Sequence, residues 1–115
     1  MSFNPHDFLV LARALATAGN SHEAEYRTAV SRAYYAAHLQ ARERLVAAGE
    51  LVPTKSGEDH RLIVRRLRAR GGSEGDQLDW LRIRRIRADY RLGAVMTAVQ
   101  ARQAVDVAQA LWPRI

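Results

Sequence analysis

The chain has 115 residues, a length that allows one domain with a modest hydrophobic core, and its lack of cysteine excludes disulfides and cysteine-based metal sites. Its 18 basic residues, all but one of them arginine, outnumber 12 acidic residues and leave a net charge of +6. No basic segment precedes the first apolar residues, and no run approaches the roughly 18 apolar residues of a membrane span, so we expect one cytoplasmic domain over residues 1–115 without a membrane segment.

The first two predicted helices are marked by capping residues. Asn4 and Pro5 are typical of a helix start, and Gly19 is typical of the end of that helix. The apolar stripe expected on it comprises Phe8, Leu11, Ala12 and Leu15. Asn20 and Glu23 have the spacing of a capping box, which predicts a second and longer helix of roughly 28 residues.

This second helix contains the stretch SRAYYAAH, residues 31–38. At about 100° per residue, one broad face of the helix carries Ser31, Tyr34, Tyr35, His38 and Arg42. Histidine transfers protons near neutral pH and arginine binds phosphate through paired hydrogen bonds, so Arg32 and His38 are candidate catalytic residues for work on a phosphodiester. The alternative is structural: Tyr34 and Tyr35 pack against the core, and His38 is a half-buried polar residue.

Three more helices are expected in the second half of the chain. Ser56 and Asp59 have the spacing that caps a third helix, and Thr97 with Gln100 has the spacing that caps a fifth. The fourth helix is expected to bury two apolar stripes, Leu81, Ala88 and Leu92 in one and Ile83, Ile86 and Tyr90 in the other. An uninterrupted helix through Gly93 is the alternative to a separate fifth helix. Helices with short connections predict an all-α, antiparallel bundle of four to five helices.

The basic charge is concentrated in the third and fourth predicted helices. Residues 61–91 hold ten arginines and four acidic residues, whereas the rest of the chain is balanced. Arg84, Arg87 and Arg91 form a stripe on the fourth helix that has no acidic residue of its own. Such a positive field attracts polyanions, nucleic acid first, which makes the stripe a candidate phosphate-binding row. The alternative is a solvated helix face with ion pairs.

Three features of the chain resemble the HEPN domain, a family of small helical proteins in prokaryotic toxin–antitoxin and defence systems. They are SRAYYAAH on a long second helix, His60 at the start of a third, and LRIRRIRADY on a fourth. The resemblance covers nearly the whole chain. It implies an up-and-down bundle of four or five helices, usually a homodimer. We expect structural or dimer-forming roles for Tyr34, Tyr35 and Asp89. Asp89 is four residues after Arg85 and seven after Arg82, so it can pair with either. We expect no metal and no cofactor.

The resemblance also implies an activity. Many members are metal-independent ribonucleases in which an Arg-x(4–6)-His motif from each protomer meets its mate across the dimer cleft; the 2′-hydroxyl attacks the adjacent phosphate, the histidine moves protons and the arginine stabilises the charge. In this chain only Arg32 and His38 match that spacing. The late-helix position of the motif corresponds to Arg87, which no histidine follows.

Three functions are therefore open. The first is a dimeric ribonuclease with Arg32, His38 and Arg87 near a shared cleft. The second is a non-catalytic module that binds RNA, a nucleotide or a minimal nucleotidyltransferase antitoxin through the arginine row and Tyr90. The third is an assembly domain whose tyrosine face is buried in a dimer.

Overall fold

Five α-helices and one short 3₁₀ helix form the part of the chain that the computed structural model describes, residues 3–54 and 56–115. They are α1 (His6–Thr17), α2 (Glu23–Ala47), α3 (Asp59–Ala69), α4 (Glu74–Tyr90), α5 (Ala98–Leu111) and η1 (Trp112–Arg114). These described residues contain no strand, so the prediction of an all-α fold is confirmed. Within the same ranges, no helix combines the length and the apolar character needed to cross a bilayer.

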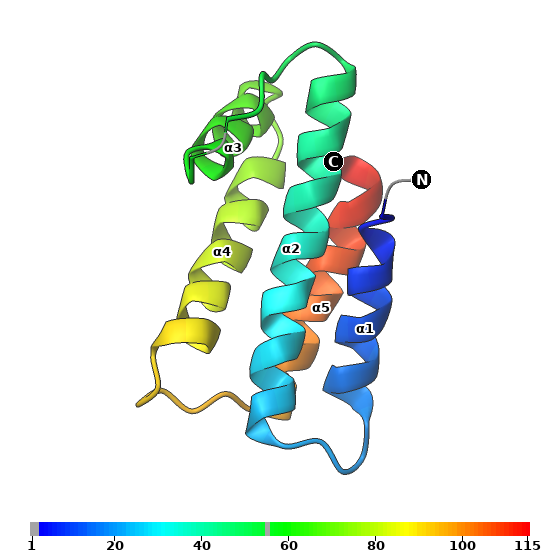
Figure 1. Cartoon of the computed structure of the whole chain (residues 1–115), viewed down its shortest axis with the longest axis vertical. Helices are drawn as coiled ribbons and strands as arrows, with labels where there is room; N and C mark the ends of the chain where they lie inside the picture. Colours follow the sequence, from blue (N-terminus) through cyan, green and yellow to red (C-terminus); the bar gives the residue numbers. More distant parts are fainter. Residues whose placement is uncertain (1–2, 55) are drawn as a thin grey trace.

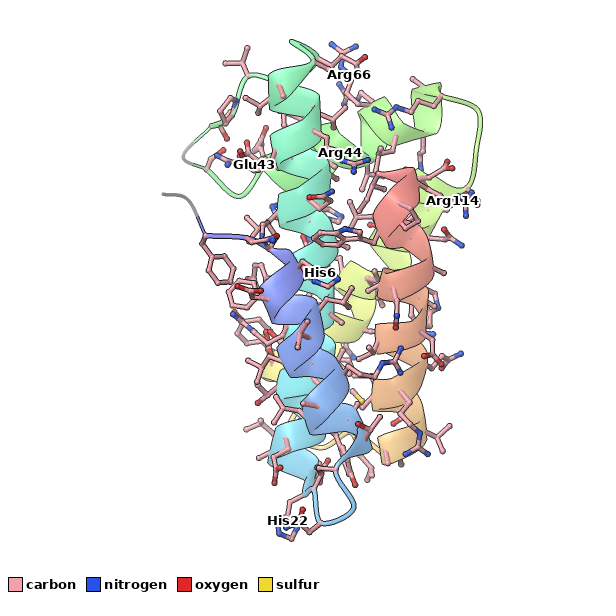
Figure 2. All side chains as sticks on the ribbon, turned by 90° about the vertical axis from the view of Figure 1, so that its right-hand side faces the viewer. His6, His22, Glu43, Arg44, Arg66 and Arg114 are labelled. Atoms are coloured by element: carbon pink, nitrogen blue, oxygen red, sulfur yellow. The ribbon has the colours of Figure 1, made fainter. Side chains whose placement is uncertain are left out.

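The four helices α1, α2, α4 and α5 lie side by side along the long axis of the molecule, and successive members of this group run in opposite directions (Figure 1). α2 contacts each of the other three, whereas α3 lies at one end of the bundle and packs mainly on α4. Arg66 lies at the end that α3 covers, and His22 lies at the opposite end (Figure 2). The two ends of the chain meet beside α1, where the rings of His6 and Trp112 are 5.3 Å apart.

α2 is buried on several sides because three long helices contact it. Its fully buried side chains are mostly small, namely Ala29, Ala33, Ala36, Ala37 and Ala41. Small side chains let neighbouring helices approach closely, and larger side chains from those neighbours fill the remaining space. Those larger side chains include Leu78 and Leu81 on α4 and Leu111 on α5. Burial on several sides explains why the sequence of α2 shows no single apolar stripe.

Several predicted helix boundaries are confirmed. α1 begins directly after Pro5, and Asn4 Oδ1 accepts the backbone N–H of His6 at 3.0 Å. α5 begins with the predicted capping box, in which the Gln100 N–H donates to Thr97 Oγ1 at 3.2 Å and the Thr97 N–H donates to Gln100 Oε1 at 2.9 Å. These bonds satisfy amide groups that a helix start would otherwise leave without partners.

The capping box predicted at Asn20 and Glu23 is wrong. The start of α2 instead uses Glu25, whose carboxylate accepts the backbone N–H of His22 at 3.2 Å. Glu23 has another role: its Oε1 accepts the backbone N–H of Met96 at 2.9 Å and the Arg27 guanidinium at 3.1 Å. Glu23 was expected to cap α2, but its side chain instead binds Met96, which is distant in the sequence.

Arg27 stabilises the end of α4 and the segment that joins it to α5. Its Nη1 donates to the backbone carbonyl of Ala88 at 2.8 Å and to those of Arg87 and Arg91 at 3.3 Å, and its Nη2 donates to the carbonyl of Ala94. The last carbonyls of a helix have no partner within it, and a cation there also interacts favourably with the helix dipole. The structure therefore has two separate helices, and the alternative of one helix through Gly93 is excluded.

The apolar stripes predicted for α1 and α4 are partly wrong. On α4, Leu81 and Ala88 are buried, but Ile83 is 50% exposed and Tyr90 is 70% exposed. Leu92 is exposed as well, because α4 ends at Tyr90 and the chain turns away from the core. On α1 the fully buried side chains are Leu9, Ala12 and Ala16, while Leu11 faces solvent. Both helices thus leave large aliphatic side chains on the surface.

Candidate functional site

A chain of polar side chains runs through the interior where α2, α3 and α4 meet. The Tyr34 hydroxyl lies 2.7 Å from Nδ1 of His60 and 3.3 Å from Nδ1 of His38. On its other side, His60 Nε2 lies 3.2 Å from Oδ1 of Asp79. The two imidazoles stack with their centroids 6.1 Å apart. Asp79, His60, Tyr34 and His38 therefore form one relay of hydrogen bonds that joins the three helices.

The partners of this relay fix where its protons lie. Because Asp79 can only accept while it is ionised, His60 carries its proton on Nε2 and donates it to that carboxylate. His60 Nδ1 then accepts the single proton of the Tyr34 hydroxyl, and the hydroxyl oxygen accepts the Nδ1 proton of His38. Each hydrogen bond of the relay then has one donor and one acceptor while both histidines are neutral.

The environment favours this neutral state. Burial lowers the pKa of His38 to about 4, and the neighbouring His60 and Arg42 add to the effect. Burial also lowers the pKa of His60, although the bond to Asp79 opposes the shift. Burial raises the pKa of the Tyr34 hydroxyl. At neutral pH the relay therefore holds its protons in place and serves as a positioning network for His60.

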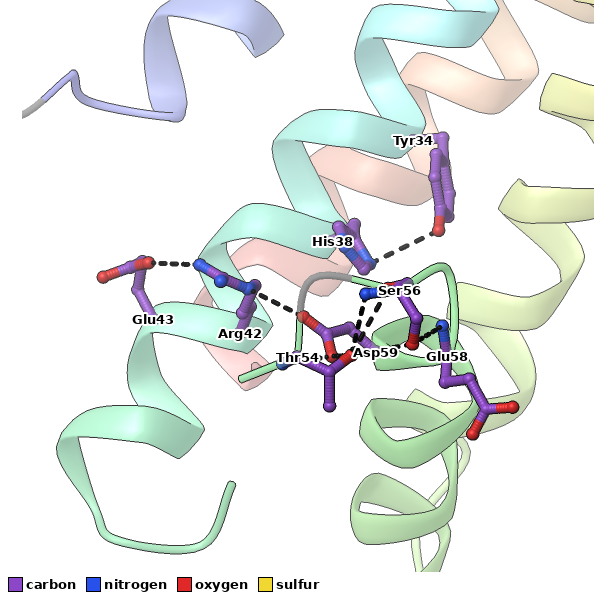
Figure 3. A network of polar contacts seen from close by, with 8 residues as sticks. All are labelled: Tyr34, His38, Arg42, Glu43, Thr54, Ser56, Glu58 and Asp59. Atoms are coloured by element: carbon purple, nitrogen blue, oxygen red, sulfur yellow. Dashed lines mark hydrogen bonds and ion pairs between the residues drawn. The ribbon is translucent and has the colours of Figure 1, made fainter. Parts of the chain in front are cut away.

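A second network of hydrogen bonds fixes the segment before α3. Asp59 Oδ1 accepts the backbone N–H of Thr54 at 2.9 Å and its hydroxyl at 2.7 Å, and Arg42 Nε donates to Asp59 Oδ2 at 3.2 Å (Figure 3). These bonds, led by the Thr54 hydroxyl, lower the pKa of Asp59. The partner of Asp59 is therefore Thr54 rather than Ser56, whose hydroxyl accepts the backbone N–H of Glu58 at 3.4 Å.

The candidate pair Arg32 and His38 is not brought together within the chain. The Arg32 guanidinium lies over the ring of Phe8 and over that of Tyr35, each 4.9 Å from the ring centroid. His38 turns instead toward Tyr34 and the relay. Among the arginines, Arg42 lowers the pKa of His38 most, and it lies one helical turn further along α2.

The remaining residues singled out on α2 tie this helix to α4. Arg85 lies over the rings of Tyr35 and Tyr90, at 5.3 Å and 5.8 Å, and pairs with Asp89 at 3.5 Å. Asp89 also accepts the hydroxyl of Ser31 at 3.2 Å. The expected pairing of Asp89 with Arg85 is confirmed, and it places a half-buried cation between two tyrosines.

The three arginines of the predicted row do share one surface hollow. Arg84, Arg87 and Arg91 line a hollow of about 380 Å³ on the outer face of α4, together with Ile83 and Ile86. The Arg84 guanidinium stacks on Trp80 at 4.2 Å. Within the described residues none of the three arginines makes an ion pair. The row is therefore a set of cations whose charge the fold does not neutralise.

A second basic hollow, of about 370 Å³, lies between α3 and α4. Its polar lining comprises His60, Arg61, Arg65, Arg68, Asp79 and Arg82. Sequence reasoning found His60 only as a helix start and missed this hollow. A signal was present, because Arg61, Arg65 and Arg68 recur at i, i+4 and i+7 and so share one face of α3.

No protein family model matches this chain, and no curated protein and no solved structure matches it either. The features that bear on its function are the two arginine-lined hollows and the relay, of which His60 and Asp79 line the hollow between α3 and α4.

Proposed function

We propose that this protein is a HEPN-type, up-and-down helical bundle of a prokaryotic toxin–antitoxin or defence system that binds RNA through the outer face of α4. The observation that carries the proposal is the row of Arg84, Arg87 and Arg91 along a single hollow without carboxylate partners in the described part of the chain. Guanidinium groups bind phosphate oxygens in a fork, and contacts with backbone phosphates supply essentially all of the affinity in non-specific binding of nucleic acid.

Binding without cleavage fits the contacts on α2 better than catalysis does. Arg32 is stacked on Phe8 and Tyr35, away from His38, and His38 is held neutral inside the relay. A general acid or base needs its ring nitrogen within reach of the substrate. Of the functions that the sequence left open, the non-catalytic module is therefore the one that we propose.

The surface beside the row also supports a protein partner, and we include a homodimer or a nucleotidyltransferase-type antitoxin in the proposal. Exposed aliphatic side chains lie on α4, in the segment that follows it and at the start of α5, namely Ile83, Leu92, Val95 and Val99. A group of exposed aliphatic residues rimmed by polar ones is typical of an interaction surface. RNA phosphates would bind the arginines, and a partner would cover the aliphatic side chains.

The test measures binding of a fluorescent single-stranded RNA by the purified protein and by Arg87→Gln/Arg91→Gln. Loss of two charge-assisted hydrogen bonds is expected to weaken binding at least roughly tenfold. The matched control is Arg44→Gln/Arg102→Gln, which removes the same charge from exposed positions on α2 and α5. Equal weakening in both double variants would mean that only net charge matters and would contradict a site on α4.

The same samples test cleavage directly. Incubation of RNA with the protein in EDTA is expected to leave the RNA intact. Cleavage that persists in EDTA and is lost in His38→Ala would replace the binding module by a metal-independent ribonuclease with His38 at its centre.

A further inference from the structure

The hollow between α3 and α4 lies on a different side of α4 from the proposed RNA-binding row. Arg82 lines the first and Arg84 lines the second, and two residues along a helix are separated by about 200° around its axis. The two sites can therefore be removed by separate substitutions. The row on α4 does not account for the arginines that α3 contributes to this hollow.

Cations dominate the wall of this hollow. Four guanidinium groups, from Arg61, Arg65, Arg68 and Arg82, surround a single carboxylate, that of Asp79. Arg68 is engaged by acidic groups, at 2.8 Å from Asp76 and 4.0 Å from Asp79. The other three make no ion pair within the described ranges. The hollow thus carries a positive charge that is available to an anion.

The floor of the hollow is polar and rigid. His60 is 8% exposed and has both ring nitrogens engaged, one by Tyr34 at 2.7 Å and the other by Asp79 at 3.2 Å. The relay therefore holds the imidazole in one orientation before any ligand arrives. Gly57 also lines the hollow, and the space beside its backbone is open because it has no side chain.

We propose that this hollow binds the dianionic phosphate of a phosphomonoester. A monoester carries up to two negative charges and three terminal oxygens that accept hydrogen bonds, whereas each phosphodiester of an RNA backbone carries one charge. Guanidinium groups that converge on one concave site from two helices match the monoester, and a row along one helix matches a strand of diesters. The volume of about 370 Å³ lies in the range of small-molecule sites, so part of a nucleoside also fits.

Calorimetric titration tests the proposal with adenosine 5′-monophosphate, inorganic phosphate and adenosine. We expect the first two to bind and adenosine not to bind. Arg65→Gln/Arg82→Gln is expected to weaken binding of the monophosphate at least tenfold. Its matched control is Arg66→Gln/Arg102→Gln, which removes the same charge outside the hollow and is expected to bind like the wild type. Thermal unfolding of each variant checks that it is folded, and Arg61→Gln provides a second, milder variant.

Two sources of the monoester are distinguished by an RNA with a 5′-phosphate and the same RNA with a 5′-hydroxyl. In Arg87→Gln/Arg91→Gln, tighter binding of the 5′-phosphorylated RNA than of the 5′-hydroxyl RNA assigns the site to an RNA end, and equal binding of the two RNAs assigns it to a free nucleotide. Arg87→Gln/Arg91→Gln is expected to keep its affinity for the monophosphate, which separates this site from the row. Failure of the monophosphate to bind, equal binding of adenosine, or wild-type affinity in Arg65→Gln/Arg82→Gln would overturn the proposal.

Discussion

At the residue scale, the Tyr34 hydroxyl has a central role because it forms hydrogen bonds with two imidazoles from different helices. We expect Tyr34→Phe to lower the free energy of unfolding by about 1–3 kcal/mol, because His60 Nδ1 keeps its burial and loses its donor. Urea unfolding measures the change. The control is Tyr26→Phe, since the Tyr26 hydroxyl makes no hydrogen bond with the described residues. Equal stability of Tyr34→Phe and the wild type would show that the relay contributes nothing to the fold.

The two histidines of the relay also predict how stability depends on pH. Both have a lower pKa in the folded chain than their ordinary value, so the unfolded chain binds more protons as the pH falls below about 6.5. Their contribution is therefore complete above that pH and is lost as the pH falls toward about 4. For His38 alone, with a pKa of about 4, the expected loss between pH 7 and pH 5 is about 2 kcal/mol.

Urea unfolding at pH 7 and pH 5 measures this loss. His38→Gln should show a smaller difference between the two pH values than the wild type. Unchanged stability of the wild type between pH 7 and pH 5 would mean that the histidines are not held neutral by the fold.

At the element scale, the separation of α4 from α5 depends on a residue of α2. Arg27 donates to carbonyls at the end of α4 and in the segment that leads to α5. Its side chain is 16% exposed, so water cannot fully replace it. We expect Arg27→Met to lower the free energy of unfolding by about 2 kcal/mol, measured by urea unfolding. Arg102→Met removes an exposed arginine from α5 and should cost little; a similar loss in both variants would contradict the capping role of Arg27.

The helix boundaries show what local sequence determines. Pro5 and the pair Thr97–Gln100 act through their own backbone or through a residue three positions away, and each marks a boundary correctly to within two residues. The contacts of Glu23 and Arg27 could not be predicted from local spacing, because their partners lie about 60 to 70 residues further along the chain. The stripe of Ile83, Ile86 and Tyr90 failed for a related reason: periodicity identifies an apolar face but not whether another helix covers it.

At the scale of the whole molecule, the site was predictable in part. The charge excess in residues 61–91 and the spacing of Arg84, Arg87 and Arg91 predicted a shared basic surface, and these arginines line one hollow. The hollow between α3 and α4 needed the tertiary fold, since Arg65 and Arg82 become neighbours only when the two helices pack. Gly75 allows that packing, because a Cβ there would lie 2.8 Å from the carbonyl oxygen of Val64 on α3.

The most direct test of the central claim is the salt dependence of RNA binding. For the wild type we expect log K to fall linearly with log salt concentration, because phosphate contacts release counterions. Arg87→Gln/Arg91→Gln should reduce the magnitude of that slope by about 2, close to one for each phosphate contact removed. A slope near zero for the wild type, or the same slope in the double variant, would contradict RNA binding through the arginine row of α4.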